Sequence, residues 1–238
     1  MHQSVDPRPH CSALSYGRCV TRRSEQLTEA LQEYVEAHSA RPDQILTELA
    51  EQTASMFSAE AVMQIGPEQG TFMTLLARLV GAARAVEIGT FTGYSAICVA
   101  RGLAEGGRLL CCDISEEWTS VAREYWRRAG LADRIELRLG PAARTLRELP
   151  EGTNFDYAFI DADKTSYVEY WNLIVPMIRS NGVILVDNTL WNGRVVDPSI
   201  TGGTVEAIRQ FNDHAKADER VELVLLPIGD GLTLARKR

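Results

Sequence analysis

The sequence lacks the features that define several common protein classes. Its five cysteines are an odd number without a C-x-x-C spacing, which argues against a disulfide framework or a zinc knuckle. No apolar run approaches the roughly 20 residues that cross a bilayer, and the N-terminus has no apolar centre of a secretory signal. The net charge of -7 argues against a protein that holds nucleic acid through its phosphates. We therefore expect a cytoplasmic protein that acts on small molecules.

The rest of the composition is that of an ordinary globular protein. Hydrophobic residues make up 45% and charged residues 24% of the 238 positions, enough for one substantial core. Residues 1–23 differ, because they hold four arginines against one aspartate and show little apolar periodicity. We expect a basic leader over 1–23 and a single domain over 24–238.

Three helices are expected at the start of this domain. One begins with a cap at Ser24, a second runs from about Asp43 to Phe57, and a third begins at Pro67, a residue well suited to the first helical position. Their apolar stripes are expected to be Leu27, Leu31, Tyr34 and Val35 on the first helix, and Phe72, Leu75, Leu76 and Leu79 on the third.

Short apolar runs then alternate with helical stretches. Strands are predicted at 84–89, 108–113, 134–139, 156–161 and 182–187, with helices near 93–104, 115–129, 141–149 and 164–179. This alternation predicts β-α-β units and a parallel sheet covered on both faces. A helix near 203–217 and two final strands joined by 228–230 would add an antiparallel hairpin at the edge. The predicted fold class is α/β, a single doubly wound, Rossmann-like, mostly parallel sheet of seven strands with extra N-terminal helices.

In such a sheet the ligand binds at the carboxyl ends of the strands, so the residues there are candidates for a site. The first strand ends in a loop with Gly89 and Gly93, where a ligand can approach the backbone. The loop is not G-x-G-x-x-G, so a nucleoside without phosphates fits it better than a dinucleotide. Asp113, at the end of the second strand, either accepts hydrogen bonds from a ribose or is an ordinary turn-and-cap residue.

Acidic residues also follow the fourth and fifth strands. Asp161 and Asp187 end strands that are usually neighbours in this architecture, and Asn188 adds a carbonyl oxygen. Three oxygen donors without Cys or His favour a hard cation, Mg²⁺ first and Mn²⁺ or Ca²⁺ as alternatives. In the competing interpretation, each Asp caps the next helix or satisfies a loop amide.

Lys164 directly follows these acidic residues. Most lysines are solvated surface charges, but none of the four histidines lies in a strand-end motif to act as a base. Lys164 therefore becomes a candidate to accept a proton or to hold a substrate oxyanion.

Three motifs, EIGTFTGYS, DADKTSY and VDNTLWNG, occur in order. They resemble those of the cation-dependent O-methyltransferases typified by caffeoyl-CoA and catechol O-methyltransferases, and the likeness runs from about Leu27 to the C-terminus. The resemblance implies an S-adenosylmethionine-dependent homodimer that methylates a small molecule with adjacent oxygens. It implies cofactor contacts at Met63, Glu87, Gly89, Thr90, Ser95, Asp113, Ala142 and Asp163, metal ligands at Asp161, Asp187 and Asn188, a base at Lys164, and a substrate mouth at Trp191 and Asn192.

Several alternatives remain open at this point. The acceptor could be a catechol, a caffeoyl-type phenol, a hydroxyacyl group on a carrier protein, or a tRNA nucleoside, although the acidic net charge makes nucleic acid a poor partner. A nicotinamide-dependent oxidoreductase is disfavoured by the missing third loop glycine. A non-catalytic cofactor-binding module would leave Lys164 and Asp187 without a role.

Overall fold

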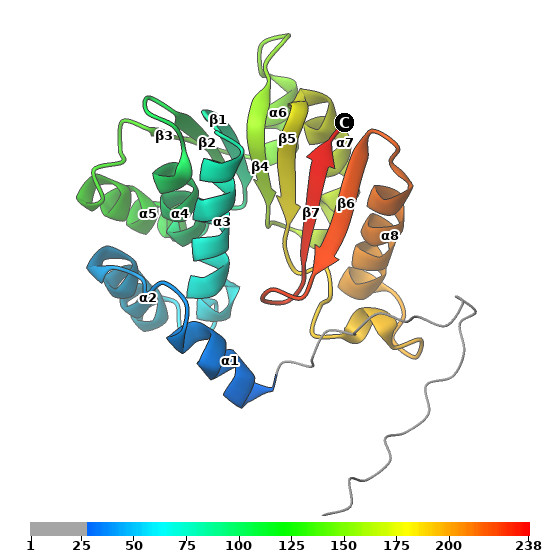
Figure 1. Ribbon diagram of the computed structural model, residues 1–238, viewed down its shortest axis with the longest axis horizontal. Coiled ribbons are helices and arrows are strands. Elements are labelled where there is room, and N and C mark those ends of the chain that lie inside the picture. The colour runs from blue at the N-terminus through cyan, green and yellow to red at the C-terminus, as the bar shows by residue number, and fades with distance from the viewer. Residues whose placement is uncertain (1–27) are drawn as a thin grey trace, which may run out of the picture.

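The computed structural model describes residues 28–238 and forms one seven-stranded sheet (Figure 1). Its strand order is β3-β2-β1-β4-β5-β7-β6, parallel from β3 to β5 and antiparallel where β7 pairs with β5 and β6. The predicted fold class is confirmed, including the C-terminal edge hairpin. The basic leader over 1–23 and the cap at Ser24 lie outside the described residues. The strands are β1 (Arg84–Ile88), β2 (Arg108–Asp113), β3 (Ile135–Leu139), β4 (Phe155–Ile160), β5 (Ile178–Val186), β6 (Val221–Leu226) and β7 (Leu232–Lys237).

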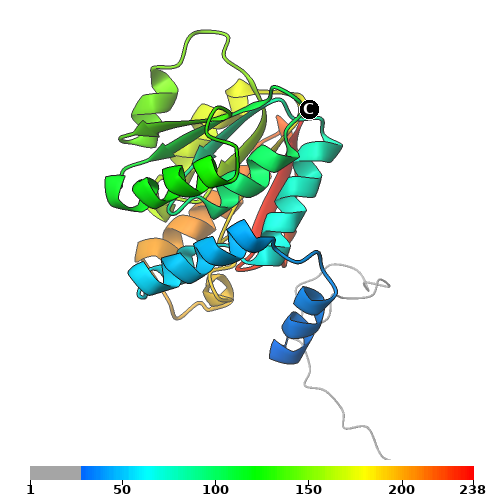
Figure 2. The same cartoon turned by 90° about the vertical axis from the view of Figure 1, so that its left-hand side faces the viewer.

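Helices cover both faces of the sheet (Figures 1 and 2). On one face α2 to α5 pack over one hydrophobic core, and on the other α6 to α8 pack over a second. Among the described residues, no helix combines the length and apolar character needed to cross a bilayer. The helices are α1 (Glu29–Ala37), α2 (Gln44–Met56), α3 (Pro67–Leu79), α4 (Tyr94–Gly102), α5 (Glu116–Arg128), α6 (Ala142–Arg147), α7 (Tyr167–Met177) and α8 (Gly203–Ala217), with short 3-10 helices at Ala61–Met63, Lys164–Ser166 and Arg194–Val196.

The buried faces of two N-terminal helices differ from the predicted stripes. On α3, Phe72 and Leu76 of the predicted stripe pack partly buried against the core, but Leu75 is 51% and Leu79 is 83% exposed. The fully buried face is formed by Gly70, Met73 and Ala77 instead. The reason is close helix packing, because a Cβ at Gly70 would lie 2.8 Å from a sulfur atom of α4. On α1, the three described members of the predicted stripe are also exposed: Leu31, Tyr34 and Val35.

Strand β5 begins earlier than predicted. The apolar run that starts at Val183 forms its buried second half, but the chain enters the strand at Ile178, directly after α7. Asn181 has a positive φ of 63°, and the pairing with β4 shifts register between Phe155 and Tyr157. The irregular start brings the second half of β5 into register with β4, which sets the positions of the residues that follow both strands.

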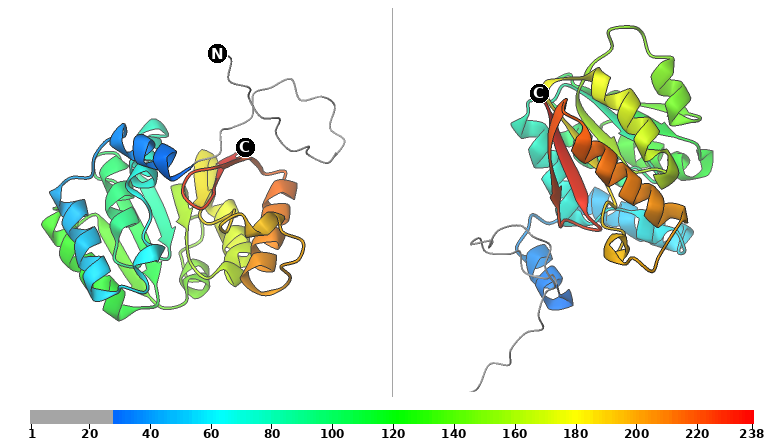
Figure 3. Two further views of the ribbon diagram at one scale, coloured as in Figure 1. Left: turned by 90° about the horizontal axis from the view of Figure 1, so that it is seen from below. Right: turned by 90° about the vertical axis from the view of Figure 1, so that its right-hand side faces the viewer.

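The carboxyl ends of β1, β2, β4 and β5 lie together at the lower edge of the sheet in Figure 1, and the left view of Figure 3 looks onto this edge. The β6–β7 turn and the loop after β5 lie at the same edge. Backbone hydrogen bonds join them, from Thr189 N to Gly231 O at 2.9 Å and from Leu190 N to Asp230 O at 3.0 Å. The predicted site residues are therefore gathered at one edge by the sheet topology.

Candidate active site

The acidic residues after β4 and β5 occupy equivalent positions. Ile160 pairs with Val186 in the parallel ladder, so Asp161 and Asp187 come next on adjacent strands. The side chain of Asp161 is 18% exposed, and Asp187 is 3% exposed. Burial, followed by the charge of Asp161, raises the pKa of Asp187 well above its usual range. Two carboxyl groups are thus held close together in a poorly solvated place.

Gln69, which the sequence analysis did not single out, holds one of these carboxylates. Its side-chain amide donates a 2.7 Å hydrogen bond to Oδ2 of Asp187, and Gln69 is 2% exposed. The other oxygen, Oδ1, accepts the backbone N–H of Asn188 at 2.7 Å. This hydrogen bond fixes the orientation of the Asp187 carboxylate, because leaving a buried donor or acceptor without a partner costs about 1–3 kcal/mol.

Lys164 lies against the Asp161 carboxylate rather than in solvent. Its Nζ is 2.8 Å from Oδ1 of Asp161, and its side chain is 11% exposed. The amine also lies 5.0 Å from the centre of the Tyr167 ring and 6.0 Å from that of Trp191. The aromatic rings and the carboxylate position the amine beside Asp161, at the end of β4.

The loop after β5 has an unusual backbone. Asn188, Trp191 and Asn192 all have positive φ angles, of 56°, 47° and 52°. Residues other than glycine adopt this region at a cost that is smallest for Asn and reaches the order of 1–3 kcal/mol for others, and such residues cluster at functional sites. The backbone N–H of Asn192 donates to the Asp230 carboxylate, so the β6–β7 turn holds the loop in this conformation.

The predicted metal ligands suit a hard cation by their chemistry. Over residues 28–238, there is no group of three or more His, Cys, Asp or Glu side chains that could hold a metal ion. The predicted set consists of two carboxylates, Asp161 and Asp187, and one side-chain amide, that of Asn188. Asn188 directly follows Asp187 in the chain. Two neighbouring carboxylates repel each other when ionised, and a divalent cation would relieve that repulsion.

The glycine loop is needed for the packing of the protein itself. Gly89 and Gly93 both have φ of 85°, as their turns require. A Cβ at Gly89 would lie 1.9 Å from the backbone oxygen of Asp161, and one at Gly93 would lie 2.6 Å from Nε1 of Trp126. The prediction that these glycines make room for a ligand was therefore incomplete, because protein atoms already fill the space beside each Cα.

Replacing Gly89 by alanine is expected to lower the free energy of unfolding by about 2–5 kcal/mol, from the left-handed backbone and the overlap with Asp161 together. Thermal unfolding of the purified variant measures this loss. Gly106→Ala is the matched control, since Gly106 has φ of 70° and nothing within 4 Å of the added Cβ. Equal losses in the two variants would contradict the packing argument.

Asp113 has the turn-and-cap role that the sequence left open. Its Oδ2 accepts the backbone N–H groups of Thr90 at 2.8 Å and Phe91 at 2.9 Å, and its Oδ1 accepts that of Ser115 at 2.8 Å. The carboxylate thereby fixes the glycine loop against the end of β2. Its predicted hydrogen bonds to a ribose stay a prediction.

Glu87 is a buried carboxyl group without a cation partner. Its side chain is fully buried on β1, and Oε2 has no hydrogen-bond partner within the described part of the chain. Burial raises the pKa of Glu87 to about 8, and the nearby hydroxyl group of Ser95 offsets only part of this effect. The Thr90 hydroxyl also lacks a hydrogen-bond partner. These groups fit a ligand that brings a positive charge and hydrogen-bonding atoms.

The remaining predicted cofactor residues come from four separate parts of the chain. Asp163 accepts hydrogen bonds from the hydroxyls of Tyr170, at 2.6 Å, and Ser166. Ala142 is the first residue of α6 and is buried, while Met63 ends the first 3-10 helix and is 43% exposed. Their contacts with a cofactor stay predictions, as do those of Ser95 in the first turn of α4.

Comparison with known proteins gives a consistent result. The family model described as O-methyltransferase matches residues 36–238. A probable caffeoyl-CoA O-methyltransferase from Dictyostelium discoideum is 38% identical over 216 residues, which cover 89% of this chain and 93% of that protein.

Two solved structures are similar in fold and sequence. An O-methyltransferase from Bacillus cereus in complex with SAH superposes with a TM-score of 0.80 at 33% identity, covering 88% of this chain and 97% of that one. The O-methyltransferase TomG from Streptomyces achromogenes, involved in tomaymycin synthesis and in complex with SAM, gives 0.79 at 30% identity, covering 87% and 96%.

Proposed function

Because the chain belongs to the O-methyltransferase family and is an S-adenosylmethionine-dependent enzyme, we propose that it methylates a small molecule carrying two adjacent oxygens, with the help of a divalent cation. The family match removes the nicotinamide-dependent oxidoreductase and the non-catalytic module from consideration. The acceptor class is a catechol or a caffeoyl-type phenol, in keeping with the names of the relatives.

The observation that carries the proposal is the arrangement of Asp161, Lys164 and Asp187. A buried carboxylate, a second carboxylate and an amine meet at the ends of two adjacent strands, with 2.8 Å between the amine and Asp161. Asp161, Asp187 and Asn188 would hold the cation. When bound there, a divalent cation lowers the pKa of an acceptor hydroxyl and fixes its orientation.

The chain's own residues do the rest of the work. Lys164, with its amine held by Asp161, takes the hydroxyl proton or stabilises the resulting oxyanion. Glu87 lies at the end of β1, in the strand that separates the proposed metal site from Asp113, and would meet the positive charge of a bound cofactor. Gln69 keeps Asp187 oriented, and Trp191 forms a wall of the acceptor site. S-adenosylmethionine supplies a methyl group that an oxygen nucleophile attacks in line.

Removal of divalent metal is expected to lower methyl transfer to a vicinal diol by at least about 100-fold, because a neutral hydroxyl is a poor nucleophile. Transfer of labelled methyl groups in EDTA, and after Mg²⁺ is restored, measures the effect. Asp161→Ala is expected to show the same loss and to abolish Mn²⁺ binding by calorimetry. Asp133→Ala, at an exposed position, is the control. Full activity in EDTA together with full activity of Asp161→Ala would refute the cation-dependent mechanism.

The expected homodimer remains part of this proposal. Exposed apolar side chains on α3 and β6 support it, since Leu75, Leu79 and Val224 are 51%, 83% and 47% exposed. Such side chains are often covered by a partner subunit.

A further inference from the structure

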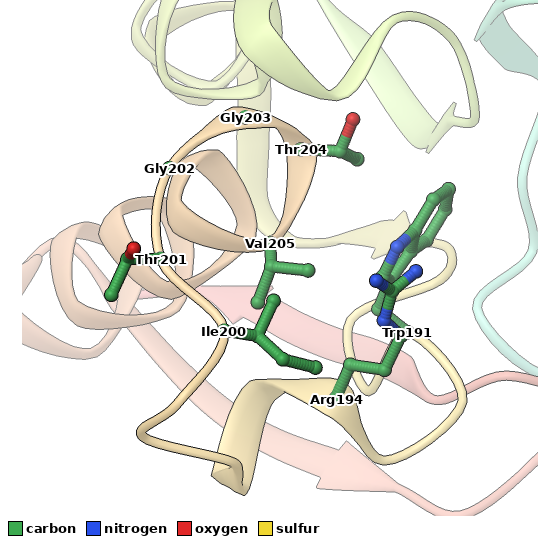
Figure 4. Close-up of a pocket in the computed structure, with 8 residues that line it drawn as sticks. All are labelled: Trp191, Arg194, Ile200, Thr201, Gly202, Gly203, Thr204 and Val205. Carbon is green, nitrogen blue, oxygen red and sulfur yellow. The ribbon is translucent and has the colours of Figure 1, made fainter.

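A cavity lies beside Trp191, between the loop after β5 and α8 (Figure 4). Its volume is about 340 Å³, and its walls come from the loop after β5 and the first turn of α8. Trp191 and Arg194 point into it from one side, and Ile200 and Val205 lie on the other. The cavity combines one positive charge, an aromatic ring and aliphatic side chains.

The charge of Arg194 is available to a ligand. Its guanidinium makes no hydrogen bond or salt bridge with any other residue of the range 28–238, and no acidic side chain lines the cavity. Asp197 is the acidic residue of this loop, but its Oδ1 accepts the backbone N–H and the hydroxyl of Ser199, at 2.9 and 2.6 Å. The pKa of Asp197 is lowered mainly by its hydrogen bonds to Ser199 and, to a smaller extent, by the charges of Arg209 and Arg194, but no salt bridge joins Arg194 to Asp197 within the described residues. A ligand at Arg194 would therefore have no direct side-chain contact to displace.

The loop that carries Arg194 is fixed by Arg209 of α8. The guanidinium of Arg209 donates to four backbone oxygens of the loop, including Val195 at 2.9 Å and Ile200 at 2.7 Å. A five-donor fork that satisfies four carbonyl groups holds the loop in one conformation. These hydrogen bonds fix the backbone that forms one wall of the cavity and carries Arg194.

Trp191 joins this cavity to the proposed methyl-transfer site. Its ring lies 6.0 Å from Nζ of Lys164 and also forms part of the cavity wall. An acceptor whose hydroxyls lie at Asp161 and Lys164 and whose opposite end extends past Trp191 would enter this cavity, where Arg194 lies.

Resting on the proposed function, we propose that Arg194 is a specificity-determining residue and that the acceptor carries an anionic group, a carboxylate or a phosphate, opposite its two hydroxyls. Arg194 binds that group by charge-assisted hydrogen bonds, and Ile200 and Val205 contact the chain or ring next to it. The amide groups in the first turn of α8 add partial positive charge.

The test compares 3,4-dihydroxybenzoate, its methyl ester and 3,4-dihydroxybenzyl phosphate as acceptors, with S-adenosylmethionine and Mg²⁺. We expect one of the two anions to be used with a kcat/KM about 10- to 100-fold above that of the neutral ester. Which anion is preferred distinguishes a carboxylate acceptor from a phosphate acceptor. Arg194→Gln is expected to remove this preference while transfer to the ester is unchanged, and Arg194→Lys to retain part of it. Arg123→Gln, on the exposed side of α5, is the matched control.

A binding measurement separates this proposal from the function it rests on. The product analogue 4-hydroxy-3-methoxybenzoate and its methyl ester are titrated calorimetrically in EDTA without cofactor, where no transfer occurs. Tighter binding of the acid to the wild-type protein, lost in Arg194→Gln, would support the cavity even if no diol were methylated. Equal use of the acid, phosphate and ester acceptors, together with equal binding of the acid and ester product analogues, would overturn the inference and leave the proposed function intact.

Discussion

Replacing Lys164 by methionine is expected to lower kcat for methyl transfer about 10²- to 10⁴-fold, the usual range for loss of a general base. The amine is nearly buried, is paired with Asp161 at 2.8 Å and lies beside the ring of Trp191, so no exposed lysine can take its place. Steady-state kinetics with a vicinal diol under saturating Mg²⁺ measures the change. The affinity for S-adenosylmethionine is expected to change by no more than a few-fold, since Lys164 is not among the predicted cofactor contacts.

Lys164→Arg separates the two roles of this residue. Arginine keeps the positive charge and can still pair with Asp161, but it cannot release its proton in a protein. If Lys164 acts as the base, the arginine variant is expected to be nearly as slow as the methionine variant. An arginine variant with close to wild-type kcat would instead show that the charge alone is needed, to hold the acceptor oxyanion. Wild-type kcat in the methionine variant would remove Lys164 from the reaction.

The positions of the strand-end residues could be predicted because two local signals agree there. Apolar runs identify the buried strands, and a parallel sheet places all their carboxyl ends at one edge, so the sequence alone predicts that Asp113, Asp161 and Asp187 lie at that edge, as observed. The same reasoning gave α8 its observed bounds, Gly203–Ala217. Periodicity and turn residues are local properties, and the fold class depends mainly on them.

The supporting residues could not be predicted, because their partners are distant in the sequence. Gln69 lies 118 positions before Asp187, and nothing in the PEQG segment indicates which carboxylate it meets. Arg209 looks like any helix-surface arginine until the loop at 194–200 is folded against it. Such contacts depend on how helices lie on the sheet, which one sequence does not specify.

The buried face of α3 illustrates the same limit within one element. The leucines suggested a stripe through Leu75 and Leu79, but α4 packs against the smaller residues Gly70 and Ala77. Hydrophobicity alone predicts that the leucines form the buried face of α3. Two helices that lie close together, however, have room only for small side chains between them. Leu75 and Leu79 are therefore left exposed on the outer side of α3.

Glu87→Gln is expected to change both the pH dependence of stability and the binding of the cofactor. The pKa of Glu87 is raised to about 8 by burial and, to a smaller extent, by the charge of Asp161. The folded protein therefore binds one more proton than the unfolded chain between pH 4.5 and about 8. The contribution of Glu87 to the free energy of unfolding is therefore highest below pH 4.5. It falls as the pH rises from 4.5 to about 8.

The size of this effect follows from the shift in the pKa. Ionising Glu87 in the folded protein at pH 8 or above costs about 4–5 kcal/mol relative to the unfolded chain. Glutamine at this position cannot ionise, so without cofactor the variant is expected to be more stable than the wild type above about pH 6, with the difference growing up to pH 8. Urea unfolding between pH 5 and 9 measures it. Glu105→Gln, at an exposed loop position, controls for the change of carboxyl to amide.

Glu87→Gln is expected to weaken cofactor binding, although it stabilises the cofactor-free protein. S-adenosylmethionine is a cation, so at pH 7 its binding favours the ionised form of Glu87 and releases close to one proton from a carboxyl group that is mostly protonated beforehand. Calorimetry in buffers of different ionisation enthalpy counts this proton. In Glu87→Gln the release is expected to disappear and the affinity to fall about 10- to 100-fold. If Glu87→Gln bound the cofactor with unchanged affinity and the same proton release, the positive charge of the cofactor would not lie near residue 87. The buried carboxyl group of the wild-type protein would then need an explanation that does not involve the cofactor.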